Sequence, residues 1–447
     1  MIPKNKNRCA AAEDALYRKV TRRVMPFLFV AYVVAFIDRI NIGFAQMQMK
    51  GDLGFSDAVY GLGAGIFFLG YFLFEVPSNL LLHRIGARRT FVRIMACWGL
   101  VSAGMAFVVE PWQLYVVRFL LGVFEAGFFP GIVLYLSYWF PPSRRASPTS
   151  WIFVGIAVAG VVGGIVSGAI MDHANGLHGL RGWQWMYILE GIPAVVLGIM
   201  AYWMIDDGPR TAVWLAPLER DTLIARLSGE EERNTEGTAN STRDVLRNAR
   251  VYLLAAVWFS LVCGGAVISF WLPAVIKDAG AKTIFEVGYL SAIPYGIGTI
   301  GIILISRHSD ATQERRWHHL ICAVGGGIAL FVLAFWTHSL PAALALLTIA
   351  ATLTFSALAV FWTIPQRYLS GVGAAAGISV ISSLGQLGSF FSPTMMGWIK
   401  VTTGSLNNGL FVMGSLMILG GIGLFLAMDT PQTTGATSAG LTPAAED

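Results

Sequence analysis

Long apolar runs separated by short polar segments dominate the chain. A hydrocarbon core about 30 Å thick requires about 20 apolar residues per helix, and runs of this length occur six times, stop, and occur six times more. The first six runs are 24–46, 58–82, 91–109, 112–138, 148–171 and 183–204, and the second six are 251–276, 284–306, 317–337, 341–364, 373–399 and 408–428. The pattern predicts an all-α membrane protein with twelve transmembrane helices in two six-helix halves.

The polar segments divide the chain into five parts. We expect a cytoplasmic N-terminal tail over 1–23, a six-helix bundle over 24–204, a cytoplasmic linker over 205–250, a second six-helix bundle over 251–428 and a cytoplasmic C-terminal tail over 429–447. The linker mixes arginines with glutamates, which is typical of a solvated amphipathic segment; a regulatory docking surface is the alternative interpretation. This layout is typical of transporters assembled from two related halves.

Composition supports the membrane assignment. Charged residues make up 13% of the chain and hydrophobic residues 55%, whereas soluble domains carry about 25% charged residues. A soluble enzyme, a disordered protein and a nucleic-acid binder are therefore excluded, and the lipid bilayer is the expected partner. The sequence contains no nucleotide-binding signature and no metal-site pattern, so we expect neither a cofactor nor a metal, and we expect a monomer.

Lysines and arginines lie mostly on one side of the predicted membrane. Apart from the N-terminal tail and the linker, that side carries Arg84, Arg88, Arg89, Arg93, Arg144, Arg145, Arg307, Arg315, Arg316 and Arg367, whereas the opposite side carries Lys50, Arg181, Lys277, Lys282 and Lys400. Positive residues favour the cytoplasmic side. We therefore expect a multi-pass protein of the inner (plasma) membrane with both termini in the cytoplasm.

Four ionisable residues lie deep inside two predicted spans. Asp38 and Arg39 belong to the first span, and Arg118 and Glu125 to the fourth. Ionisable residues in a membrane span indicate function because burying them is costly. From a rise of about 1.5 Å per residue, Asp38 and Arg118 lie at one level and are expected to pair, while Arg39 points into a cavity. The interpretation is an anion site with a proton relay; the alternative is a static salt-bridge cluster that sets helix packing.

Two further acids lie in predicted spans of the first half. Glu75 lies near the arginines that follow the second span, and we interpret Glu75, Arg84 and Arg88 as a gating latch on the cytoplasmic side. Glu190 stands beside Gly191 and Pro193 in the sixth span, and we interpret it as mainly structural. The second half has no acid well inside a span, so charge chemistry is expected in the first half only.

Several motifs resemble the anion:cation symporter family of the major facilitator superfamily, in order along almost the whole chain. They are Phe36-Ile37-Asp38-Arg39-Ile40-Asn41-Ile42-Gly43, Glu75-Val76-Pro77-Ser78-Asn79, the segment 118–131, the segment from Gly182-Trp183 to Gly191, the segment 307–317 and Phe361-Trp362-Thr363-Ile364-Pro365. The resemblance implies the major facilitator fold and proton-coupled symport of small organic anions such as phthalate, tartrate, hydroxyphenylacetate and sugar acids, driven by the proton gradient.

The resemblance also implies roles for individual residues. Arg39 and Arg118 would hold the substrate carboxylate, with Asp38 and Glu125 as proton carriers. Tyr71 and Trp362 would line the pocket, and Asn41 belongs to the helix-1 motif and is counted with the substrate site. In the eleventh span Ser382, Ser383 and Gln386 form a polar stripe at helical spacing, which we assign to the pocket; hydrogen bonding between helices is the alternative.

Three positions depart from the sugar-acid carriers of that family. Phe36 replaces a tyrosine, Ser382 replaces an asparagine, and a glutamine expected near Ile156 is missing. Because buried hydroxyls need hydrogen-bonding partners, we favour an aromatic or simple mono- or dicarboxylate. A sugar-acid or tartrate symporter and an anion exporter or antiporter remain alternatives, whereas an intramembrane enzyme is disfavoured by the short outer loops.

Overall fold

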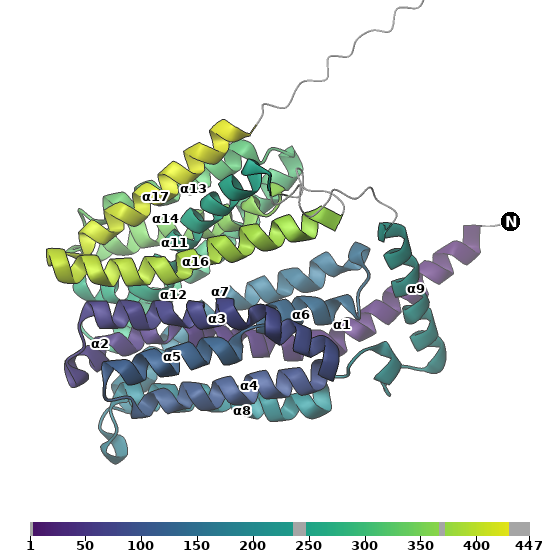
Figure 1. The fold of residues 1–447 in the computed structure, drawn as a ribbon, viewed down its shortest axis with the longest axis horizontal. Coiled ribbons are helices and arrows are strands. Elements are labelled where there is room, and N and C mark those ends of the chain that lie inside the picture. The colour runs from purple at the N-terminus through teal and green to yellow at the C-terminus, as the bar shows by residue number, and fades with distance from the viewer. Residues whose placement is uncertain (1–2, 236–246, 366–371, 429–447) are drawn as a thin grey trace, which may run out of the picture.

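The described residues of the computed structural model form helices without strands, arranged as two halves with a linker between them (Figure 1). The structure describes residues 3–235, 247–365 and 372–428. The first half consists of α1 (Pro3–Ile40), α2 (Ile42–Leu53), α3 (Asp57–Ile85), α4 (Ala87–Gly104), α5 (Pro111–Glu125), α6 (Phe128–Ser137), α7 (Pro142–His173) and α8 (Gly182–Met204). The second half consists of α11 (Ala249–Asp278), α12 (Ile284–Thr312), α13 (Arg316–Leu333), α14 (Leu340–Phe361), α16 (Val372–Thr403) and α17 (Leu406–Ala427). The short turns η1 (Met105–Phe107), η2 (Leu177–Gly179) and η3 (Pro209–Thr211) and the helix α9 (Pro217–Thr235) complete the described elements.

Eleven segments in the described part of the chain are long and apolar enough to cross a membrane. They coincide with eleven of the twelve predicted spans. The remaining predicted span corresponds to α16, which is 32 residues long and carries Ser382, Ser383 and Gln386 along its length. The all-α fold predicted from the apolar runs is confirmed.

Two predicted spans are each built from two helices. In the first span the single residue Asn41 separates α1 from α2, with a helical backbone and its hydrogen bond to Ile37 kept. The fourth span breaks at Ala126 and Gly127, between α5 and α6. Gly127 has a φ of 82°, a left-handed conformation that residues with a Cβ adopt rarely. The break in the fourth span directly follows Glu125, as in transporters whose binding sites lie at discontinuous helices.

Glycines bring α3 and α5 into backbone contact beside this break. A Cβ atom on Gly122 would lie 1.9 Å from the carbonyl oxygen of Phe67, and one on Gly70 would lie 2.4 Å from that of Phe119. Small residues allow such close approach in membrane helices, where packing replaces the hydrophobic driving force. The charged residues of α5 are therefore held directly against α3.

The contacts between the two halves gather at one end of the molecule, which we call the closed end and define by residues 50–57, 172–182, 278–284 and 400–406. There α3 packs on α16 through Gly61, Gly65 and Gly397. On the other side of the interface, α7 packs on α12, where a Cβ on Gly288 would lie 2.4 Å from the carbonyl oxygen of Gly164.

The face of α3 that packs on α16 becomes exposed toward the other end. Gly61 and Gly65 contact α16 at the closed end. Val76 lies on the same face about three turns further on, because helical positions repeat every 3.6 residues, and it is 66% exposed. The halves thus diverge toward the opposite end, which we call the tail end because α9 and the start of α1 lie there (Figure 1).

At the tail end, α9 docks on the first half rather than standing free. Leu223 of α9 is fully buried, Trp214 stacks on Trp139 with ring centroids 5.5 Å apart, and Glu219 lies 2.6 Å from the Nζ atom of Lys19. The hydrogen bond from Lys19 holds the pKa of the exposed Glu219 carboxyl below its usual range. The described part of the predicted linker therefore packs on the first half.

We predict that Gly122→Ala destabilises the first half. The added methyl group meets the backbone of Phe67 and cannot be relieved by a side-chain movement, so overpacking should cost about 1–3 kcal/mol. The measurement is thermal unfolding of the purified protein in detergent, followed by tryptophan fluorescence. Gly423→Ala is the matched control, because nothing lies within 4 Å of a Cβ there; its melting temperature should stay unchanged or rise. Equal melting temperatures for both variants would contradict the close α3–α5 contact.

Candidate functional site

An ion pair between Arg39 and Glu125 joins the first predicted span to the fourth. The Nη2 atom of Arg39, next to the end of α1, donates to Oε1 of Glu125, the last residue of α5. Glu125 is fully buried, whereas 17% of the Arg39 side chain is exposed. A helix C-terminus carries partial negative charge, so an ionised Glu125 at that position depends on a nearby cation, which Arg39 supplies.

Two aromatic rings of α3 cover the arginines. The guanidinium carbon of Arg39 lies 5.5 Å from the ring centroid of Phe67 and 5.4 Å from that of Tyr71. The guanidinium carbon of Arg118 lies 4.9 Å from the same Phe67 ring. Phe67 therefore stands against both cations, and such contacts strengthen where water is excluded.

Arg118 is a fully buried cation with two unused donor groups. Its Nε atom donates to the carbonyl oxygen of Gly63 at 3.1 Å. Its two Nη atoms have no hydrogen-bond partner, and no ion pair within the described residues includes it. Burying a charge without a partner is costly, and a guanidinium presents paired donors that match a carboxylate. The arrangement is thus suited to an anion that the chain itself does not supply.

Asp38 does not pair with Arg118, so that expectation is wrong. Its carboxylate accepts hydrogen bonds from Nε1 of Trp98 at 2.9 Å and from Oγ of Ser102 at 2.7 Å, both on α4. Neighbouring residues on a helix point about 100° apart, and the rotation of α1 turns Asp38 toward α4 and Arg39 toward α5. Asp38 is therefore a fully buried acid held by neutral donors.

Asn41 is also turned away from the arginines. It is fully buried at the α1–α2 junction, and its Nδ2 atom donates to Oε2 of Glu190 at 3.1 Å. In this conformation the amide of Asn41 thus binds another side chain of the protein.

The site residues expected in the second half lie apart from the arginines. Trp362 packs edge-on against Trp258, with ring centroids 4.8 Å apart, and Gly385 lies directly against Trp258. Ser382 and Gln386, on either side of Gly385, are half-buried. No hydrogen bond, ion pair or ring contact within the described part of the chain joins this group to Arg39 or Arg118, so a shared pocket would require the halves to approach.

The expected latch between Glu75 and the loop arginines is not formed. Arg88 instead binds the segment after α8: its Nη2 atom lies 3.1 Å from Oδ1 of Asp206, and its backbone N–H donates to Asp207 at 2.9 Å. Among the described residues Glu75 has no ion pair, and Arg84 is exposed. Arg88 therefore ties α4 to α8 within the first half.

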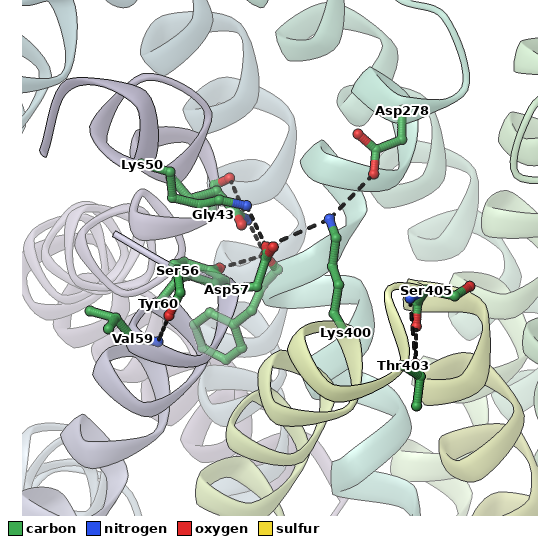
Figure 2. A network of polar contacts seen from close by, with 12 residues as sticks. Gly43, Lys50, Ser56, Asp57, Val59, Tyr60, Asp278, Lys400, Thr403 and Ser405 are labelled. Atoms are coloured by element: carbon green, nitrogen blue, oxygen red, sulfur yellow. Dashed lines mark hydrogen bonds and ion pairs between the residues drawn. The ribbon is translucent and has the colours of Figure 1, made fainter. Parts of the chain in front are cut away.

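Charged residues at the closed end connect the halves (Figure 2). Asp57, in the first turn of α3, pairs with Lys50 of α2, and its Oδ1 atom lies 3.5 Å from Nζ of Lys400 on α16. Lys400 also lies 3.5 Å from Oδ2 of Asp278 on α11. Nearby, Tyr60 donates to the carbonyl oxygen of Phe270 at 2.6 Å. We call Lys50, Asp57, Asp278 and Lys400 the closed-end network.

Sequence reasoning missed the closed-end network and the residues that position Asp38. The four network residues look like ordinary charges at span ends, and the sequence carries no signal that pairs Asp57 with Lys400. Trp98 and Ser102 lie four residues apart, which places them on one face of α4; that spacing was the available signal. Nothing in the sequence distinguishes Phe67 from the other phenylalanines of the predicted spans.

Comparisons with known proteins extend these observations. The sequence matches the profile described as Major Facilitator Superfamily over residues 28–393. A protein of Agrobacterium vitis, provisionally named a tartrate transporter, is 44% identical over 94% of this chain and 93% of its own length. A Pseudomonas putida protein, provisionally named metabolite transport protein NicT, is 40% identical over 91% of this chain and 92% of its own. A bacterial homologue of the human lysosomal transporter Spinster, solved inward-facing and occupied, shares the fold with a TM-score of 0.72 at 18% identity, covering 92% of this chain and 97% of that chain.

We predict that Lys400→Gln loosens the closed end. The variant removes both ion pairs that Lys400 makes across and beside the interface, each worth about 0–1 kcal/mol when partly exposed. Because only the pair with Asp57 joins the two halves, the population separated at this end should rise up to about fivefold. The measurement is the distance distribution between spin labels at Gly51 and Val401, read by pulsed electron paramagnetic resonance. The control is Lys282→Gln, because Lys282 is exposed at the same end and has no ion pair among the described residues; it should leave the distribution unchanged. Equal distributions in the wild type and both variants would contradict a role of Lys400 in holding this end closed.

Proposed function

This chain belongs to the Major Facilitator Superfamily, and from that premise we propose that it takes up a small organic carboxylate together with protons by alternating access. It is a multi-span membrane transporter and not an enzyme. We place the tail end in the cytoplasm, as the distribution of lysine and arginine favours, so the conformation described above is the inward-facing one.

The proposal rests mainly on the Arg39–Glu125 ion pair. A carboxylate that enters from the tail end meets Arg39 first, because Arg39 is the partly exposed member of the site. There it competes with the carboxylate of Glu125 for one guanidinium. A proton on Glu125 removes the competing charge and frees Arg39. Protonation of Glu125 and binding of the anion therefore favour each other, which is the thermodynamic requirement for coupled movement.

Arg118 and Asp38 extend this scheme. The unused Nη donors of Arg118 offer a second position for an anionic group behind Phe67. Asp38, held by Trp98 and Ser102, is a second acid that can take up or release a proton. On this scheme Glu125 and Asp38 carry protons, while Arg39 and Arg118 hold the anion and Phe67 and Tyr71 cover it.

We infer a short carboxylate as the substrate. Two cations around one aromatic ring suit a compact acid with an apolar or aromatic body or with two carboxyl groups, and the few neutral polar side chains beside them suit few hydroxyls. The A. vitis relative, provisionally named a tartrate transporter, is consistent with a dicarboxylate. Outward transport uses the same site and remains the alternative, which the direction of gradient-driven flux decides.

We predict that Glu125→Gln loses gradient-driven accumulation but keeps exchange of the anion. Glutamine preserves the size of the side chain and cannot carry a proton, so substrate can cross without coupling. The measurement is accumulation of labelled tartrate in proteoliposomes with a pH gradient, beside counterflow without a gradient. Glu110→Gln, at an exposed position of the closed end, is the control. Full accumulation by Glu125→Gln would remove Glu125 from the proton path.

We predict that a panel of phthalate, hydroxyphenylacetate, tartrate and galactonate raises the melting temperature unequally, with galactonate the weakest. The shift by the best ligand should disappear in Arg39→Lys, because an ammonium cannot make the paired hydrogen bonds of a guanidinium. Loss of charge-assisted bonds worth about 1.5–3 kcal/mol corresponds to an affinity loss of roughly 10–100-fold. Stabilisation by galactonate alone would contradict the substrate class, and an unchanged shift in Arg39→Lys would contradict the role of Arg39.

A further inference from the structure

A further carboxyl group is buried in the first half, outside the arginine site. Glu190 lies in the middle part of α8 and is 6% exposed. Its Oε1 atom accepts a hydrogen bond from Oγ of Ser167 on α7 at 2.6 Å, and its Oε2 atom accepts one from Nδ2 of Asn41 at 3.1 Å. Both donors are neutral. The sequence interpretation of Glu190 as mainly structural therefore leaves its charge without compensation.

No cation balances this carboxyl group. Within the described residues, no lysine, arginine or histidine nitrogen lies within 4 Å of Glu190 or of Asp38. The nearest titratable groups are Asp38 on the neighbouring helix α1 and Tyr187 on α8, and the nearest cation on α5 is Arg118. An ionised carboxylate held only by neutral donors in a membrane interior is costly, because burial of charge is expensive.

Asn41 is placed to serve both protonation states of Glu190. Its Nδ2 atom donates to the carboxylate, while its buried Oδ1 atom has no hydrogen-bond partner. A carboxylate only accepts hydrogen bonds, whereas a carboxylic acid also donates one, and an amide offers both a donor and an acceptor. A half-turn of the Asn41 amide therefore exchanges a donor for an acceptor toward Glu190. Asn41 stands at the α1–α2 junction, two residues after Arg39. A change in its hydrogen bonding therefore occurs beside the arginine site.

From this geometry we propose that Glu190 is a proton-binding residue that forms a further proton site on the closed-end side of the Arg39–Glu125 pair. Glu190 follows the start of α8 by eight residues, or about 12 Å, and Glu125 follows the start of α5 by fourteen, or about 21 Å. A proton that enters from the closed end thus meets Glu190 before Glu125. The inference rests on the proposed function for its role in coupling, but the binding of a proton at Glu190 does not.

The first experiment measures protonation directly in the purified protein. Infrared difference spectra between acid and alkaline pH record the carbonyl band of protonated carboxyl groups. We expect Glu190→Gln to remove one component of this band, and Glu110→Gln, a solvent-exposed carboxyl at the closed end, to remove only a component at the position of an exposed acid. A buried-acid band that is identical in wild type and Glu190→Gln would overturn the proposal whatever the protein transports.

The second experiment measures the number of protons moved per tartrate from reversal potentials in proteoliposomes. We expect Glu190→Gln to lower that number by one, while binding of tartrate, followed by thermal shift, changes less than about threefold. Ser167→Ala removes a hydrogen bond but keeps the acid, so it should keep the wild-type number. Equal losses in Glu190→Gln and Ser167→Ala would instead assign Glu190 to helix packing. Wild-type transport without proton movement would refute the proposed function and leave the infrared result to decide the proton site.

A third variant tests the proposal if Glu190→Gln does not fold. Glu190→Asp keeps a titratable carboxyl but shortens its reach to Ser167 and Asn41. A proton site predicts a lower melting temperature with an unchanged proton number, whereas a structural residue predicts that aspartate is worse than glutamine in every measurement. Transport that requires sodium in wild type and loses this requirement in Glu190→Asp or Glu190→Gln would assign the site to a sodium ion and overturn the proton assignment.

Discussion

The cost of charge in a membrane interior is the constraint on which this structure depends. Removing one partner of a buried ion pair costs about 3–5 kcal/mol, because the other charge is left uncompensated. The pair between Arg39 and Glu125 can therefore open only when a proton neutralises Glu125 or an anion replaces it. Beside this pair the fourth span is broken, aromatic rings lie against the guanidinium groups and the Nη donors of Arg118 are unused. In the proposed mechanism, a proton on Glu125 and an anion on Arg39 together replace this pair, which would couple their movement.

The two halves contribute unequally to that device. The described ionisable side chains deep in the membrane, Asp38, Arg39, Arg118, Glu125 and Glu190, all belong to the first half. The second half presents an aromatic group around Trp258 and Trp362 and the polar stripe on α16. This division suits a mechanism in which the first half binds charge and the second closes over it, because closure then needs no new buried ion pair.

Close helix packing holds the first half together, whereas partly exposed ion pairs connect the two halves. Backbone contacts at Gly70 and Gly122 lock α3 to α5, so the arginine site moves as one body with its aromatic cover. In the proposed mechanism the contacts that open lie at the closed end, where small residues of α3 and α16 meet and partly exposed ion pairs link Asp57, Lys400 and Asp278. Partly exposed pairs contribute little stability each, which makes them suitable for repeated opening.

The sequence alone determined the membrane fold and the division into two halves, and it singled out the charged residues inside the spans, because each follows from composition and from the length of apolar runs. Twelve runs of about twenty residues allow few other structures, and acids or arginines inside such runs are rare enough to indicate a site. Only the tertiary structure decided the partners. Asp38 faces Trp98 and Ser102 rather than Arg118, Arg39 faces Glu125, and Asp57 meets Lys400 from the other half. These pairings depend on the rotation of each helix and on the break at Gly127. An apolar run that is buried or lipid-facing on all sides carries no periodicity from which rotation could be read.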